Sequence, residues 1–236
     1  MFLIIILLVT KTMETTDTTK KQPLVRHWRW SPWKKSNYDF LKKNLAVLPS
    51  SLSLLDVGAG IEPFYTITWR FNHKSMDWQN FGTTDIVTNI TESWPVKNNS
   101  FNIIVCTNTL EHVNKPQFVL GECKRVLAKQ GTLVGTVPFL VKIHQEPHDY
   151  YRYTHYALKE LLTEAGFADV EIVPLSNSYN ILEMLLKNIK KNNPSLGTKM
   201  LLKAMGAILY LFGGPLKSAK PTLEHCEGFG FVGKVT

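Results

Sequence analysis

Two segments of the sequence gather side chains that can carry or transfer a proton. Glu111 and His112 follow the apolar run 101–107, and the polar segment 138–154 is crowded with titratable and aromatic groups. Imidazole, carboxylate and phenol groups are the usual general acids and bases of enzymes. From these segments we take four candidates for proton transfer: His112, His144, His148 and Tyr150. Three more residues of the polar segment are candidates for binding a substrate: Asp149, Tyr151 and Arg152.

Each of these groups also has a structural interpretation. His112 could bond the backbone through its ring. The polar segment could be a hydrogen-bonded network that docks the following helix, with Thr154 as N-cap. Arg152 could hold a phosphate or carboxylate group of a substrate, or it could pair with Glu146 or Asp149.

The sequence does not favour a metal site. His144 and His148 lie four residues apart, which would suit two ligands on a helix, but Pro147 between them disfavours a regular helix. The three cysteines are widely separated and form no C-x-x-C pair: Cys106, Cys123 and Cys226. We therefore predict no metal site and no disulfide scaffold.

A glycine-containing turn, Asp-Val-Gly-Ala-Gly over 56–60, follows the apolar run 51–56. Glycines allow a tight turn and the close approach of a ligand. The third glycine of the dinucleotide pattern G-x-G-x-x-G is absent, and Glu62 disfavours a bound pyrophosphate. Asp56 instead suits a ligand that carries a positive amino group.

A second acidic residue follows at the spacing expected for a nucleoside site. Asp77 lies about 20 residues after the turn and could accept both hydroxyls of a ribose. The segment 85–90 could meet an adenine edge, and Thr107 ends the apolar run 101–107.

These residues must be positioned by an alternation of strands and helices. We expect strands at 51–56, 73–77, 85–89, 101–107, 132–138, 169–174 and 229–235. We expect helices at 36–48, around 63–71, at 114–130 with Gly131 as cap, and at 154–165 with Gly166 at the end. Such an alternation predicts right-handed βαβ units and a mostly parallel sheet, with ligands at the carboxyl ends of the strands.

The motifs LLDVGAG, SMDW, FNIIVCTNTLEHV and ECKRVLAKQGTLVGTVPF occur in this order between residues 52 and 173. Together they resemble the class I S-adenosylmethionine-dependent methyltransferases of the type 11 subgroup. The resemblance implies an α/β, Rossmann-like fold. Its seven-stranded sheet would be mostly parallel with helices on both faces, its last strand antiparallel, and a helical insertion would precede that strand.

The resemblance also implies S-adenosyl-L-methionine as the cofactor and assigns its contacts. Gly58 and Gly60 would approach the methionine part, Asp56 would lie beneath its amino group, and Asp77 would hold the ribose. The remaining cofactor candidates are Asn89 and Ile90, flanking the adenine, and Thr107. Many members carry an acid in place of Asn89, but an amide can still hydrogen-bond an adenine edge.

The chain of 236 residues, with 44% hydrophobic residues and a net charge of +8, exceeds one small domain and excludes overall disorder. We divide it into an N-terminal extension with a basic–aromatic segment (1–35), a methyltransferase core (36–175 and 228–236) and a helical insertion or substrate cap (176–227). The apolar run 1–9 is too short to span a bilayer. We favour a frayed extension with Met13 as the true start over an export signal or weak anchor.

Two basic segments outside the core leave alternatives open. The segment 20–43 mixes lysines and arginines with tryptophans. It is either a lid packed on the core, which we favour, or a contact for nucleic acid or a membrane interface. The segment 196–216 is either a helix that covers a substrate pocket or an interfacial helix that makes a peripheral membrane contact.

We therefore expect an S-adenosylmethionine-dependent methyltransferase that transfers a methyl group in line to oxygen or nitrogen of a small-molecule, saccharide or lipid-like acceptor. Its predicted location is cytoplasmic, with membrane association left open. A nucleic-acid methyltransferase is the first alternative, but no Asn/Asp-Pro-Pro-Tyr signature or separate basic domain is present. A non-catalytic binding protein of the same fold is the second, and the intact Gly58, Gly60 and Asp77 argue against it.

Overall fold

The computed structural model describes residues 30–61, 64–192 and 195–236, and its centre is one seven-stranded sheet. The strand order is β3-β2-β1-β4-β5-β7-β6, and only β7 runs antiparallel to its neighbours. This confirms the predicted fold class. The strands are β1 (Ser53–Val57), β2 (Asn72–Asp77), β3 (Ile86–Val87), β4 (Phe101–Thr107), β5 (Leu127–Pro138), β6 (Ala168–Leu175) and β7 (Gly228–Lys234).

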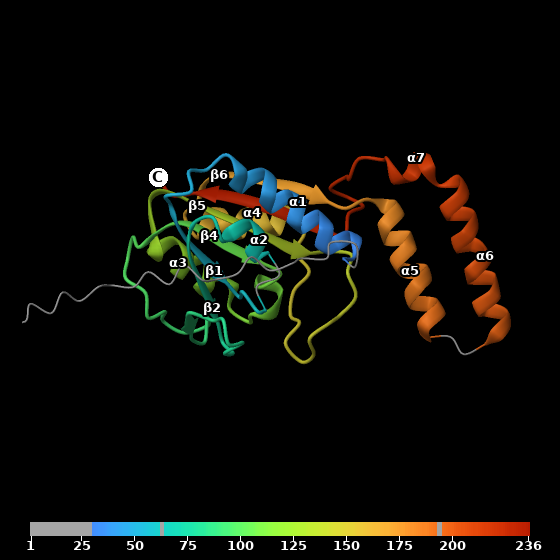
Figure 1. Cartoon of the computed structure of the whole chain (residues 1–236), viewed down its shortest axis with the longest axis horizontal. Coiled ribbons are helices and arrows are strands. Elements are labelled where there is room, and N and C mark those ends of the chain that lie inside the picture. Colours follow the sequence, from blue (N-terminus) through green and yellow to red (C-terminus); the bar gives the residue numbers. More distant parts are fainter. Residues whose placement is uncertain (1–29, 62–63, 193–194) are drawn as a thin grey trace, which may run out of the picture.

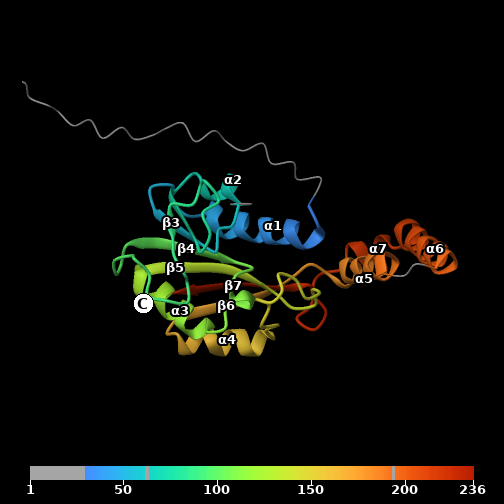
Figure 2. The same ribbon diagram turned by 90° about the horizontal axis from the view of Figure 1, so that it is seen from below.

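Helices cover both faces of the sheet. One face is covered by α1 (Pro32–Ala46) and α2 (Tyr65–Thr68), the other by α3 (Pro116–Val126) and α4 (His155–Glu164), as Figure 2 shows. The central strand β4 is therefore buried on both sides, which explains its continuously apolar sequence FNIIVCT. Because β4 is packed on both faces, the turn at its carboxyl end is held in a defined position.

Helix α1 begins four residues before the predicted start. Ser31 caps it by accepting a hydrogen bond from the Lys34 N–H at 3.2 Å, and Pro32 occupies the first turn. Trp33, next in the chain, packs with the core residues on this face of the sheet. For this tryptophan the core-packed interpretation of the basic–aromatic segment holds. Residues 1–29, which include positions 20–29 of that segment and the apolar run 1–9, lie outside the described residues.

The prediction of one helix over 114–130 is wrong at its end. Helix α3 stops at Val126, and Leu127 already has extended backbone and pairs with Phe101 across the sheet. Gly131 therefore lies inside β5 and caps no helix. The backbone requires a glycine here for another reason, since a Cβ on Gly131 would lie 2.7 Å from the Ala128 carbonyl oxygen. Thr154 does cap α4, by accepting from the Ala157 N–H.

Three helices occupy the segment between β6 and β7: α5 (Ser178–Asn192), α6 (Leu196–Phe212) and α7 (Gly214–Lys217). They form a hairpin that projects beyond the carboxyl ends of the parallel strands (Figure 1). Tyr179 is the one residue of α5 that is buried, and none of α6 is. Among the described residues no helix has the length and apolarity needed to cross a membrane.

Candidate active site

The glycine turn follows β1 and lies at the carboxyl edge of the sheet. Gly58 and Gly60 have φ of 70° and 55°, a backbone region that side chains other than glycine rarely adopt. The surroundings of the two glycines differ. A Cβ on Gly58 would collide with Thr109, whereas a Cβ on Gly60 would meet no atom of the described residues within 4 Å. Open space beside Gly60 is what a ligand that approaches the backbone closely requires.

Two buried carboxylates flank this turn from adjacent strands. Asp56 ends the apolar part of β1, and Asp77 ends β2. The Asp77 carboxylate accepts hydrogen bonds from the backbone N–H groups of Gly60 at 2.9 Å and Gln79 at 3.1 Å. Because a carboxylate offers about four acceptor positions, two remain for ribose hydroxyls. Asp77 thus ties the second strand to the glycine turn.

The residues predicted to flank the adenine lie after β3. The amide oxygen of Asn89 accepts from the backbone and hydroxyl of Thr91, and its amide nitrogen donates to Glu92 at 2.8 Å. Ile90 packs against the core while its carbonyl oxygen accepts from the Trp94 indole. Asn89 is thereby engaged in a local turn, and its contact with an adenine stays a prediction.

The turn after β4 contains two residues that sequence reasoning did not select as site residues, Asn108 and Thr109. The Asn108 side chain accepts from the Trp33 indole at 3.1 Å, and Asn108 has φ of 49°. The Thr109 hydroxyl lies 3.2 Å from the Val57 carbonyl oxygen and 3.1 Å from that of Thr107. Asparagine tolerates left-handed backbone, so a Thr-Asn-Thr run directly after a strand was the available signal.

Three of the predicted site residues come together with Glu111 beside this turn. The short helix Leu110–His112 brings Glu111 and His112, and the loop after β5 brings His144 and Asp149. His112 Nε2 lies 3.6 Å from Glu111 Oε1, and the rings of His112 and His144 are 4.8 Å apart, edge to face. The Asp149 Oδ2 atom lies 3.5 Å from His144 Nδ1, and the Asp149 carboxylate forms an ion pair with Arg152. We call Glu111, His112, His144 and Asp149 the inner cluster.

Glu111 is fully buried, and among the described residues neither of its carboxylate oxygens has a hydrogen-bond partner. Burial raises its pKa to about 8. Its carbonyl oxygen accepts from the backbone N–H groups of Tyr150 and Tyr151, at 2.8 and 3.3 Å. The loop over 139–154 is therefore fastened to the short helix Leu110–His112, which comes after β4.

Two contacts orient the histidines of the inner cluster. The His112 Nδ1 atom lies in hydrogen-bond contact with the His148 carbonyl oxygen, and burial lowers the His112 pKa. The His144 Nδ1 atom lies 3.2 Å from the Lys142 carbonyl oxygen. A carbonyl accepts only, so these two contacts favour the tautomer with the proton on Nδ1 and a lone pair on Nε2. The Arg152 Nη2 atom also lies 3.5 Å from His144 Nδ1.

Arg152 forms a two-point ion pair with Asp149, at 2.6 and 2.7 Å. These hydrogen bonds hold the Asp149 pKa at about 2. The guanidinium also donates to the carbonyl oxygens of Val141 and Lys142. Of the two carboxylates predicted as its partners, Arg152 pairs with Asp149 among the described residues, and its contact with an acceptor stays a prediction.

The other predicted residues of this loop lie farther out. His148 Nδ1 and the Tyr150 hydroxyl are 3.0 Å apart on the exposed side of the loop. The Tyr151 hydroxyl donates to the Asn114 carbonyl oxygen at 3.2 Å, and its ring stacks on Tyr153. Of the four candidates for proton transfer, only His112 and His144 thus belong to the inner cluster.

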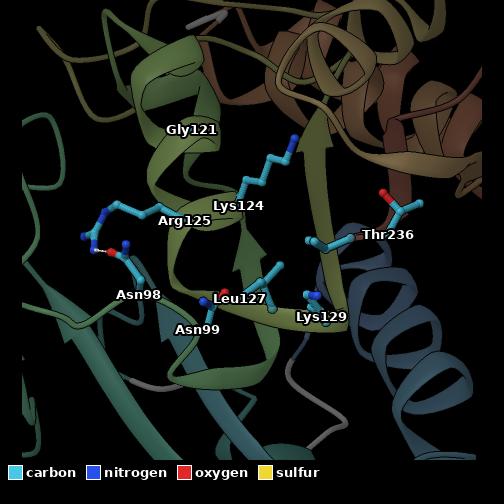
Figure 3. Close-up of a pocket in the computed structure, with 9 residues that line it drawn as sticks. Asn98, Asn99, Gly121, Lys124, Arg125, Leu127, Lys129 and Thr236 are labelled. Carbon is cyan, nitrogen blue, oxygen red and sulfur yellow. Dashed lines mark hydrogen bonds between the residues drawn. The ribbon is translucent and has the colours of Figure 1, made fainter.

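A separate hollow of about 430 Å³ lies at the opposite edge of the sheet (Figure 3). Its lining comes from the segment before β4, from α3, from the start of β5 and from the chain end after β7. The residues drawn there include Asn98, Lys124, Arg125, Lys129 and Thr236. Ligands of open parallel sheets bind at the carboxyl ends of the strands, so this hollow is not the candidate active site.

Comparisons with known proteins bear on this geometry. Residues 55–135 match the family model described as a methyltransferase domain. This span begins in β1 and ends within β5, and it contains Asp56, the glycine turn and the turn after β4.

An uncharacterized protein of Methanocaldococcus jannaschii is 31% identical over 131 residues. The alignment covers 46% of this chain and 57% of that protein, so the match spans little more than half of the relative.

Solved structures share the fold. A methyltransferase of Thermotoga maritima, described as a possible histamine N-methyltransferase, superposes with a TM-score of 0.58 over 89% of this chain and 95% of its own, at 14% identity. A methyltransferase of Archaeoglobus fulgidus gives 0.57 over 85% and 94%, at 14% identity. Phosphoethanolamine N-methyltransferase 2 of Haemonchus contortus, with bound S-adenosyl-L-methionine, gives 0.54 over 85% of this chain and 52% of its own, at 15% identity.

Proposed function

We propose that the chain, which matches a methyltransferase domain over residues 55–135 and shares the fold of solved methyltransferases, is an S-adenosylmethionine-dependent methyltransferase that methylates oxygen or nitrogen of a small-molecule, saccharide or lipid-like acceptor. The observation that carries this proposal is the continuity of residues 107–112. Thr109 contacts the glycine turn, and Glu111 and His112 begin the inner cluster two residues later. The methyl donor and the methyl acceptor would therefore meet at the same edge of the sheet.

The residues present at the glycine turn fit the cofactor. Space is open beside Gly60, Asp77 retains acceptor positions for a ribose, and Asp56 is a buried carboxylate at the end of β1. When bound, S-adenosylmethionine supplies an electrophilic methyl group on a sulfonium. The chain contributes the position and orientation of the reacting groups, which can supply roughly 7–11 kcal/mol of a barrier.

His112 is the group best placed to accept a proton from an acceptor hydroxyl or ammonium. Its Nδ1 is held by a carbonyl, its Nε2 lone pair is available, and burial favours the neutral ring because its pKa is lowered. His148 and Tyr150, at the exposed rim, would contact the acceptor rather than the reacting atoms. The acceptor roles of Asp149, Tyr151 and Arg152 become indirect, since each is engaged in holding the loop.

The lipid-like character of the acceptor is supported by the α5–α7 hairpin. Within residues 178–217 twelve large apolar side chains are exposed: Leu182, Leu185, Ile189, Leu196, Met200, Leu201, Met205, Ile208, Tyr210, Leu211, Phe212 and Leu216. The same span has six lysines against one glutamate. Exposed apolar area rimmed by lysines suits the headgroup layer of an anionic membrane.

The hairpin extends from the same edge of the sheet as the inner cluster, because β6 runs parallel to β5 and leads into α5 (Figure 1). A membrane bound by the hairpin would present its lipids on the side where the acceptor site lies. This relation connects the proposed acceptor class with the proposed peripheral membrane contact.

The test is transfer of a tritiated methyl group from S-adenosylmethionine into three fractions of a cell extract: lipids, water-soluble small molecules and nucleic acid. We expect label in the lipid or small-molecule fraction with the intact chain, and much less with the Asp77→Ala variant. Label confined to nucleic acid would overturn the acceptor proposal. Absence of binding to S-adenosylmethionine in calorimetry would overturn the assigned cofactor residues.

A further inference from the structure

Three potential ligand atoms converge in the inner cluster. We propose that Glu111, His112 and His144 bind a divalent first-row transition-metal ion. One atom from each residue, a carboxylate oxygen and two imidazole nitrogens, lies within 4.8 Å of the others. Ions such as Zn²⁺ and Fe²⁺ take two imidazoles and a carboxylate, with bonds of about 2.0–2.2 Å for Zn²⁺.

The buried groups of this cluster lack the partners that such groups normally have. Glu111 is completely buried, and both its carboxylate oxygens and His112 Nε2 are without hydrogen-bond partners among the described residues. Their separation of 3.6 Å is too long for a hydrogen bond between them. Buried polar groups in folded proteins are almost always satisfied, and a cation between these atoms would satisfy all three.

The orientation of the rings is that of metal ligands. Histidines that bind metals usually donate their other ring N–H to a carbonyl or carboxylate, which fixes the ring. His112 makes this contact with the His148 carbonyl oxygen, and His144 makes it with Lys142, beside Asp149. Both Nε2 lone pairs remain available, and the two carbonyl groups that contact the Nδ1 atoms belong to the same loop.

The surrounding charges are compatible with a divalent ion. Asp149 is already neutralised by Arg152 through two hydrogen bonds, so it acts as an orienting group and Arg152 brings no unpaired positive charge. Glu111 then supplies the negative ligand. Three protein ligands leave at least one position open in a four-coordinate site, as in catalytic zinc sites.

The open position gives the ion a role that rests on the proposed function. With the ion bound, the His112 Nε2 lone pair is a metal ligand, so the role of the ion replaces proton acceptance by His112. An acceptor hydroxyl bound to the metal would have a lower pKa and would release its proton more easily before methylation. The sequence disfavoured a metal because Pro147 separates His144 from His148. The cluster instead joins His144 to residues that lie more than thirty positions earlier, after β4.

The experiment measures metal binding by the full chain in the absence of cofactor and acceptor, after treatment with a chelator. Equilibrium dialysis with Zn²⁺ should give one bound ion per chain. With Co²⁺, the visible absorption spectrum should be that of a four-coordinate ion. Glu111→Gln and His144→Asn should each weaken binding at least about tenfold. His225→Asn, an exposed histidine outside the cluster, should leave it unchanged.

Unchanged affinity in both cluster variants, or no ion bound by the intact chain, would overturn the proposal. Because His144 lies on a loop and is only half-buried, His144→Asn decides the matter even if Glu111→Gln fails to fold. Circular dichroism establishes folding of each variant. Binding of S-adenosylmethionine, measured separately, distinguishes failure of this site from failure of the proposed methyl transfer.

Discussion

The hydroxyl of Thr109 occupies the space that a side chain on Gly58 would need. A Cβ atom on Gly58 would lie 2.3 Å from Thr109 Oγ1, which is impossible without movement of the backbone or of Thr109. Gly60, two residues later, has similar backbone but open space around it. The two glycines of the turn are thus required for different reasons, one for the fold and one for a ligand.

Gly58→Ala and Gly60→Ala should therefore differ in the ligand-free protein. Both incur the cost of left-handed backbone, roughly 1–2 kcal/mol, but only Gly58→Ala adds a clash. We expect the lower free energy of unfolding for Gly58→Ala in urea titrations. Adding Thr109→Ala should recover part of that loss. Equal stability of the two single variants would contradict the distinction.

Asp77→Asn should weaken binding of S-adenosylmethionine by more than about tenfold. The charged acceptor for the ribose is lost, and so is the charge-assisted hydrogen bond that holds the Gly60 N–H in the turn. Isothermal titration calorimetry measures the change. Asp169→Asn, which alters an exposed ion pair with Lys234, is the matched control and should bind normally.

Arg152→Ala should destabilise the protein by about 2–3 kcal/mol, because it leaves the nearly buried Asp149 carboxylate without its two strongest hydrogen bonds. Asp149→Asn combined with Arg152→Ala should be less harmful than Arg152→Ala alone. A double-mutant cycle in urea measures the coupling. Strict additivity of the two changes would show that the ion pair does not hold the loop.

A different ion pair should make stability depend on pH. Glu122 on α3 accepts two hydrogen bonds from Arg125, each at 2.7 Å, and these lower the Glu122 pKa. A lowered pKa in the folded state gives stability that is present above the ordinary glutamate range and is lost as the pH falls through the folded value.

Glu122→Gln should accordingly reduce stability by about 1–3 kcal/mol at pH 7, and the difference from the native chain should shrink toward pH 3. Denaturant titrations across this range measure it. Glu160→Gln, on the exposed surface of α4, is the control and should show little difference at either pH. A constant difference would mean that charge is not its source.

Charge reversal at two lysines of the hairpin should weaken its proposed binding to anionic vesicles. Each lysine near such a surface contributes about 1 kcal/mol, so Lys199→Glu with Lys203→Glu should lower vesicle affinity at least about tenfold in flotation. Lys97→Glu with Lys129→Glu, exposed at the opposite edge of the sheet, should not. Pairing of the hairpin with a second copy would instead appear as a dimer in light scattering without vesicles.

The sheet was predictable because its signal is local. A continuously apolar run such as 101–107 and a glycine turn after 51–56 each identify a buried strand and its end without tertiary information. The end of α3 was not predictable in this way, because Val126 and Leu127 are both apolar. Only the pairing of Leu127 with Phe101 decides between helix and strand. Periodicity alone does not separate the two states over short apolar stretches.

The site was predictable as a set of segments but not as a set of contacts. Sequence placed His112, His144 and Asp149 at the carboxyl edge of the sheet. It did not reveal that Glu111 points into the cluster, and it left open whether Arg152 pairs with Glu146 or with Asp149. Those relations depend on how the loop after β5 folds back across the turn after β4, over more than thirty residues of intervening chain.

The fastening of the loop to the Glu111 carbonyl oxygen has a dynamic consequence. Tyr150 and Tyr151 both donate to this one atom, and His148 contacts His112 from the same loop. Lifting the loop would break these contacts together and would remove His144 from its neighbours. The amides of residues 150 and 151 should therefore exchange with deuterium as one cooperative unit.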